Sequence, residues 1–180
     1  LCIVELGVLA AEAGFPAGAL NIVTGYGHEA GAALSAHPDI NYVSFTGSPQ
    51  VGALVQQAAA PNCVAVCLEL GGKSPQIVFA DADLDRAAAT VVKAIAQNAG
   101  QTCSAGTRLL VERSVFDAFV RRIATAFEQL RVGVPADDPD LGPVISAKQR
   151  QRVQRYIEQA RRDGVPVIAQ TPLPHDLPAA

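Results

Sequence analysis

The spacing of apolar and polar residues along the first 70 positions predicts strands and helices in alternation. A helical pattern over residues 3–14 stops at Gly14, with Pro16 beyond it. Short apolar runs bounded by turn residues predict strands at 20–23, 41–46 and 64–70. Small-residue helices are expected between them, at 29–36 and 49–60. Strands that alternate with helices at this spacing are typical of a parallel sheet.

A second α/β unit follows the Gly71-Gly72 pair, with strands predicted at 76–79 and 108–112. Asp83 has the position of an N-cap for a long alanine-rich helix. An amphipathic helix is expected over 114–130, and Ser146 and Gln149 have the spacing of a capping box for a last helix. We therefore predict an α/β fold built of two parallel-sheet units.

Composition fits this class and argues against others. Hydrophobic residues make up 49% of the 180 positions and aromatic residues 5%, which suits α/β packing better than an aromatic-rich β-sandwich. The formal net charge of −3 argues against a nucleic-acid partner. No apolar run reaches the roughly 18 residues of a membrane span, so we expect no membrane segment. The uncapped start, the lack of methionine and the loop-like end lead us to expect a segment of a longer chain.

The cysteines are expected to be reduced thiols. Cys63 and Cys67 are expected in one strand, where four residues span about 13 Å, whereas a disulfide needs Cα atoms within about 7 Å. There is no CxxC pair and no histidine close enough in sequence to indicate a zinc site, so we expect no metal. Free thiols favour a cytoplasmic protein.

Three features carry candidate chemistry. The turn around Gly47 and Ser48 joins a strand to a helix, where backbone N–H groups suit a phosphate, although an ordinary connection would have the same pattern. Glu69 stands at the end of a strand and before two glycines, where ligands of parallel sheets gather, although a surface acid is the simpler interpretation. Cys103 alone fits a structural thiol, whereas its small neighbours favour a reactive one.

These segments together resemble the aldehyde dehydrogenase superfamily, and the resemblance runs essentially end to end. It rests on four stretches, residues 12–23, 45–52, 68–75 and 100–108, with weaker support from 81–85 and 142–143. The glutamate segment and the cysteine segment, in that order, are the specific part of the match.

The resemblance implies oxidation of a small-molecule aldehyde to a carboxylic acid with NAD or NADP. Cys103 matches the nucleophile that forms a thiohemiacetal and then a thioester, and its N–H would supply half an oxyanion hole. Glu69 matches the general base that activates the hydrolytic water. The positions that match cofactor contacts are Gly27, Gly31, Phe45, Gly47, Ser48, Val51, Leu70 and Gly71.

The resemblance also implies how the chain is organised. Residues 1–70 match the C-terminal half of a Rossmann-like coenzyme domain, and residues 71–180 match the N-terminal part of an α/β catalytic domain. The family's oxyanion asparagine, its ribose-binding lysine and its nicotinamide-ribose glutamate fall outside the segment. We therefore expect the 180-residue chain alone to be inactive or nearly so, and the parent protein to form a homodimer or homotetramer.

Three alternatives stay open. A CoA-acylating relative would resolve the thioester with a thiol, although Glu69 favours water. A non-catalytic scaffold of the same fold would leave Cys103 no more reactive than Cys2. A Cys–His hydrolase would need a histidine beside Cys103, and no segment offers one.

Overall fold

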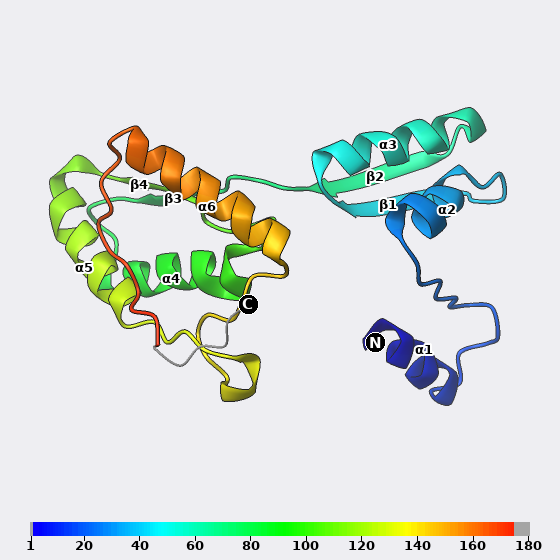
Figure 1. Cartoon of the computed structure of the whole chain (residues 1–180), viewed down its shortest axis with the longest axis horizontal. Helices are drawn as coiled ribbons and strands as arrows, with labels where there is room; N and C mark the ends of the chain where they lie inside the picture. Colours follow the sequence, from blue (N-terminus) through cyan, green and yellow to red (C-terminus); the bar gives the residue numbers. More distant parts are fainter. Residues whose placement is uncertain (1, 175–180) are drawn as a thin grey trace. The chain divides into compact units, whose positions relative to one another are not determined.

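The computed structural model describes residues 2–174 and divides between Leu70 and Gly71 into two compact units (Figure 1). Each unit contains a parallel pair of strands with helices packed around it, which confirms the α/β prediction. The elements of the first unit are α1 (Cys2–Glu12), a π-helical turn (Gly27–Gly31), α2 (Ala32–Ala36), β1 (Tyr42–Gly47), α3 (Pro49–Ala59), a 3-10 turn (Ala60–Asn62) and β2 (Ala65–Leu70).

In the first unit, β1 and β2 pair in parallel, and α3 packs on both strands. The register places Thr46 opposite Glu69 and Gly47 opposite Leu70, so both strands end at the same edge. Gly52 allows α3 to approach the sheet closely, because a Cβ at this position would lie 2.9 Å from Cδ2 of Leu70. The turn after β1 and the end of β2 therefore lie side by side.

The predicted strand at 20–23 is wrong. These residues have no strand assignment and pair with no strand among residues 2–174, and the side chain of Val23 is 72% exposed. An apolar run becomes a strand only when a neighbour satisfies its backbone N–H and C=O groups, and no described strand does so here. The helical prediction for 29–36 is confirmed, although the helix starts as a π-turn at Gly27.

The placement of Cys63 within a strand is also wrong. Its backbone is left-handed, with φ at 53°, in the turn between the 3-10 segment and β2. Cys67 does lie in β2, and all four cysteines are free thiols, as expected.

The second unit is the larger of the two. Its elements are β3 (Pro75–Val78), α4 (Leu84–Ala96), a 3-10 segment (Gln97–Gly100), β4 (Arg108–Val111), a 3-10 turn (Arg113–Val115), α5 (Phe116–Glu128), a 3-10 turn (Pro135–Asp137) and α6 (Ala147–Arg162). β3 and β4 run in parallel, with Pro75 opposite Arg108 and Val78 opposite Val111.

The core of this unit forms where α4 and α5 pack together and against the sheet. Its buried members are Val78, Ala88, Val91 and Phe119, and Leu109 and Ile123 pack against them. The ring of Phe119 is fully buried. The segment that carries Cys103 follows α4 directly in the chain, so this core holds the helix from which that segment leaves.

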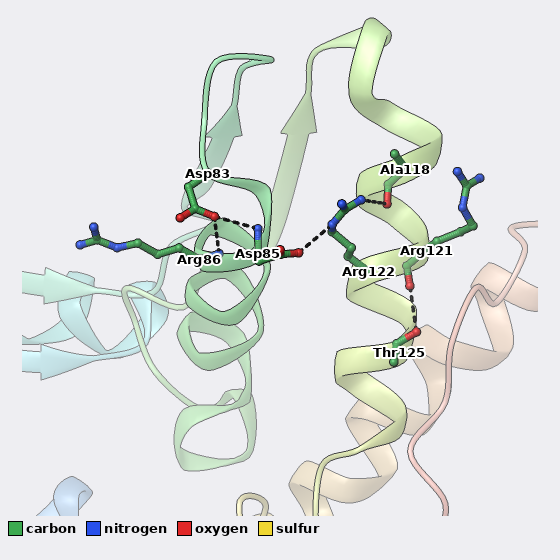
Figure 2. Close-up of polar contacts among 7 residues, drawn as sticks. All are labelled: Asp83, Asp85, Arg86, Ala118, Arg121, Arg122 and Thr125. Carbon is green, nitrogen blue, oxygen red and sulfur yellow. Dashed lines mark hydrogen bonds and ion pairs between the residues drawn. The ribbon is translucent and has the colours of Figure 1, made fainter.

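Polar contacts fix the start of α4 and link it to α5 (Figure 2). Oδ1 of Asp83 accepts hydrogen bonds from the N–H groups of Asp85 and Arg86, at 3.2 and 3.1 Å, which confirms the predicted N-cap. Nε of Arg122 lies 2.8 Å from Oδ1 of Asp85, and this carboxylate is 86% exposed. Exposed pairs of this kind contribute about 0–1 kcal/mol, so the apolar contacts set the packing of the two helices.

Glu112 gives the second unit an acid-sensitive contact. Its carboxylate accepts the N–H of Ala80 at 2.8 Å and the hydroxyl of Ser114 at 2.7 Å, and these bonds hold the pKa of Glu112 below its ordinary value of 4.5. A lowered pKa stabilises the fold at pH above the ordinary pKa value, and this contribution is lost as pH falls through the lowered pKa.

We expect Glu112→Gln to melt below the wild type at pH 7, with a difference in melting temperature that shrinks towards pH 3. Thermal melting at fixed ionic strength checks this, and a gap that is constant with pH would contradict it.

No helix within residues 2–174 is both long enough and apolar enough to cross a membrane.

Candidate active site

Cys103 lies in the middle of a loop, residues 97–107, which we call the Cys103 loop. The loop leaves α4 through three consecutive residues with left-handed backbone, Asn98, Ala99 and Gly100, with φ of 52°, 53° and 75°. Asparagine and glycine tolerate this conformation, whereas alanine pays a steric cost. The chain therefore turns sharply before it reaches the thiol.

The loop is anchored at its far end to the sheet and to α4. The N–H of Gly106 donates to the carbonyl of Ala94 at 3.3 Å, and Nε2 of Gln76 donates to the carbonyl of Gly106 at 3.0 Å. The side chain of Ala105 is 1% exposed. The Gln76 side chain packs directly on Gly106, since a Cβ at this position would overlap its amide and force that side chain to move. Cys103 itself remains exposed, so the loop presents its thiol on a fixed frame.

The backbone beside the thiol suits the stabilisation of negative charge. Among the described residues, the N–H of Cys103 has no hydrogen-bond acceptor. Its carbonyl is crowded by Gly72, where a Cβ would lie 3.0 Å from the oxygen. If the thiol attacks a carbonyl group, this N–H can donate a hydrogen bond to the carbonyl oxygen as it becomes negatively charged.

The turn after β1 has the form of an anion site. Ser48 is the N-cap of α3, and its Oγ accepts the N–H of Val51 at 3.3 Å, which leaves the hydroxyl proton free to donate. Pro49 has no N–H, and the N–H of Gly52 is bonded to the carbonyl of Ser48. In this first turn, the N–H of Gln50 is left without an acceptor among residues 2–174.

Phe45 and Leu70 shape this edge of the sheet. The Phe45 ring lies over the turn, because a Cβ at Gly47 would be 2.5 Å from its Cζ. The Leu70 side chain packs on Gly52 of α3, so a ligand would meet the backbone of Leu70 rather than its side chain. Gly71 follows, and a Cβ at this position would meet no atom within 4 Å.

Glu69 is exposed in β2, opposite Thr46. None of the ion pairs found within the described part of the chain involves its carboxylate. The same part of the chain holds no cluster of three or more His, Cys, Asp or Glu residues that could bind a metal ion. Within residues 2–174, the Glu69 carboxylate is therefore held by no ion pair.

The helical segment before β1 carries two glycines that the fold does not require. A Cβ at Gly27 or at Gly31 would meet no atom within 4 Å, and the backbone of Gly31 is right-handed, with φ −65° and ψ −43°. Glycine in a helix costs about 0.5–1 kcal/mol relative to alanine. Their presence suits a site where a ligand approaches the backbone closely.

Gly31→Ala tests this idea by separating stability from binding. We expect the first unit to gain about 0.5–1 kcal/mol of unfolding free energy, because alanine favours the helix and meets no neighbour. In a chain of the relatives' full length, we expect weaker dinucleotide binding, because the methyl group would stand in the approach to the helix. Urea unfolding and calorimetric titration measure the two effects. Unchanged dinucleotide affinity would show that Gly31 does not lie in the dinucleotide-binding site.

The structure places the predicted residues in two groups. The first unit holds Phe45, Gly47, Ser48, Val51, Glu69 and Leu70 at the carboxyl ends of β1 and β2, and Gly27 and Gly31 in the helical segment before β1. The second unit holds Gly71 and Cys103. The sequence-based prediction missed Gln76 and Gln101, whose amides hold the Cys103 loop. One local signal for this turn stands in the sequence before Gln101, because asparagine at 98 and glycine at 100 both tolerate left-handed backbone.

Comparisons with known proteins identify the family to which the chain belongs. The model of the aldehyde dehydrogenase family matches residues 1–176. The chain is 42% identical over 167 residues to (Z)-2-((N-methylformamido)methylene)-5-hydroxybutyrolactone dehydrogenase of Acinetobacter baylyi, covering 92% of this chain and 34% of that one. A crystal structure from Burkholderia cenocepacia, of a protein assigned as an aldehyde dehydrogenase, superposes with a TM-score of 0.97 at 61% identity, over 99% of this chain and 37% of that one.

A third similar protein is betaine aldehyde dehydrogenase of Staphylococcus aureus, solved in complex with NAD+. It gives a TM-score of 0.84 at 36% identity, over 91% of this chain and 33% of that one. The chain thus spans about a third of the length of the relatives it matches. Because the aldehyde dehydrogenase family model matches residues 1–176, the chain belongs to the aldehyde dehydrogenase family.

Proposed function

We propose that this chain is the part of an NAD- or NADP-dependent aldehyde dehydrogenase that carries the nucleophile and the general base. The observation that carries the proposal is the exposed thiol of Cys103 beside its own unpartnered N–H, on a loop held at both ends. Because the chain spans about a third of its relatives' length, we assign the complete reaction to a protein of their full length.

The residues present fit a dinucleotide. The hydroxyl of Ser48 and the N–H of Gln50 offer two donors to a pyrophosphate at the start of α3, and the helix dipole adds favourable charge. The bare backbone at Gly31 fits a close approach on the adenosine side. The nicotinamide ring, when bound, accepts a hydride. The S. aureus relative was solved with NAD+, which supports NAD as the first candidate.

Cys103 and Glu69 would divide the chemistry between them. The sulfur of Cys103 attacks the aldehyde carbon, and the resulting oxyanion accepts the N–H of Cys103. Loss of hydride from that carbon leaves a thioester on Cys103. Glu69 takes a proton from water as the water attacks the thioester carbon, and the sulfur leaves as a carboxylic acid is released. The chain supplies one hydrogen-bond donor to the oxyanion. Removal of one such donor raises the activation free energy by about 3 kcal/mol.

The two compact units would have different roles in this scheme. Residues 1–70, with the anion turn and the exposed glycines, would form part of the coenzyme domain. Residues 71–180, with the Cys103 loop, would form part of the catalytic domain. The free thiols support a cytoplasmic location. A homodimer or homotetramer of the complete protein follows from the family resemblance.

A CoA-acylating enzyme is the second candidate, because the same thioester could be resolved by a thiol. Product analysis separates the two. Free carboxylic acid formed without added CoA supports hydrolysis with Glu69 as base, whereas acyl-CoA formed only when CoA is present supports the alternative. A non-catalytic scaffold would give neither product.

A further inference from the structure

We propose that Gln101 is a positioning residue for Cys103, an inference that rests on the proposed role of Cys103 as nucleophile. Gln101 lies two positions before Cys103 and is half-buried. Its side-chain amide holds the loop at two points that are distant from each other in the sequence, Asn98 and Ile145.

The first point is the left-handed turn. Nε2 of Gln101 donates to the carbonyl of Asn98 at 3.0 Å, and the backbone N–H of Gln101 donates to the same oxygen at 3.0 Å. Nδ2 of Asn98 donates back to the carbonyl of Gln101 at 3.1 Å. The two residues therefore bracket Ala99 and Gly100 with reciprocal amide bonds.

The turn needs such a bracket. Ala99 has φ 53° and ψ 36°, a left-handed conformation that is sterically unfavourable for an L-residue with a Cβ. Strained backbone of this kind persists only where the surrounding contacts enforce it. The Asn98–Gln101 bonds close directly across Ala99, so they are the local contacts that can offset its strain.

The second point is the start of α6. Oε1 of Gln101 accepts the N–H of Ile145 at 2.9 Å, across 44 positions of sequence. Ile145 directly precedes Ser146, the N-cap of α6. Only a side chain that both donates and accepts can make the two contacts at once. Alanine makes neither, and a carboxylate keeps the acceptor but loses the donor.

The two ends of the loop are therefore fixed by different glutamines. Gln76 holds the end at Gly106, and Gln101 holds the end that leads into Cys103. Loss of the Gln101 contacts should free the second end while the first stays anchored. The sulfur and the N–H of Cys103 would then lose their fixed geometry, and a displacement of about 1 Å is enough to cost a large factor in rate.

Gln101→Ala in the 180-residue chain tests the proposal, with Gln97→Ala as the matched control. Gln97 lies in the same loop and is exposed, and its side chain makes none of the hydrogen bonds found among the described residues. We expect amide exchange over 98–106 to rise by about tenfold in Gln101→Ala, with α4 and α5 unchanged. We also expect the iodoacetamide rate at Cys103, relative to that at Cys2, to fall about threefold or more. Gln97→Ala should behave as the wild type.

Exchange over 98–106 that stays within about twofold of the wild type would overturn the proposal. Equal acceleration throughout α4 and α5 would also overturn it, because Gln101 would then act only on stability. Failure of the proposed function looks different: in the wild type itself, Cys103 would react no faster than Cys2, whatever the exchange results.

Gln101→Glu gives an independent pH test. A carboxylate at this position would set a negative oxygen against the carbonyl of Asn98, while its other oxygen still accepts the N–H of Ile145. The variant should therefore melt below the wild type at pH 7. The gap should close towards about pH 4, because the protonated carboxyl regains a donor while it still accepts from Ile145. A gap independent of pH would contradict the donor role of the Gln101 amide.

Discussion

Replacing Glu69 with glutamine is expected to stop turnover after a single acylation of Cys103. The amide cannot take a proton from water, so the thioester should accumulate while the earlier steps continue. General-base catalysis contributes about 10²–10⁴-fold, and we expect steady-state turnover to fall by that factor. The first turnover should remain visible as a burst of one NADH per Cys103, with an acyl group attached to the same residue.

This experiment needs a complete enzyme. Residues 2–174 can replace the matching segment of the Burkholderia cenocepacia relative, whose structure superposes with a TM-score of 0.97. Rapid-mixing absorbance with a panel of small aldehydes measures the burst, and mass spectrometry locates the acyl group. Cys103→Ala should abolish both signals, and Glu12→Gln, which changes an exposed carboxylate at the end of α1, should change neither. Steady-state turnover within about fivefold of the enzyme that carries Glu69 would show that Glu69 is not the general base.

The largest effect on stability is expected from Phe119→Ala. Phe119 of α5 is fully buried against residues of α4 and β3, and truncation of a buried phenylalanine costs about 3–5 kcal/mol through lost contacts and an unfilled cavity. Domains of this size are stable by only about 5–15 kcal/mol, so the second unit would become marginal. The Cys103 loop would lose its support, because α4 packs on this ring.

Phe116→Ala is the matched control, since Phe116 lies one turn earlier on α5 and is 49% exposed. We expect it to cost about 1 kcal/mol. Urea unfolding followed by circular dichroism compares the two variants. Similar losses for both would show that the core of the second unit does not centre on Phe119.

The features that could be predicted from the sequence are those with local causes. Asp83 marks the start of α4 because an N-cap acts within three residues, and β1 and β2 follow from short apolar runs between turn residues. Cys103 and Glu69 are identified by the motifs around them. The expected strand at 20–23 failed because a strand depends on a partner elsewhere in the chain.

The features that could not be predicted depend on distant contacts. Ala99 has no intrinsic preference for left-handed backbone, and its conformation is set by the contacts of Gln101 with Asn98 and Ile145. The bond from Gln76 to Gly106 spans 30 positions and has no local pattern. The residues that frame the thiol are therefore found only once the loop has been folded back onto α4 and α6.

The most direct test of the account is the reactivity of Cys103 in the 180-residue chain. Iodoacetamide at pH 7, followed by peptide mapping, compares Cys103 with Cys2, since both thiols are exposed in the same molecule. A nucleophile held beside an unpartnered N–H should react about tenfold faster than the reference thiol. Equal or slower alkylation of Cys103 would contradict its role as the aldehyde-capturing residue.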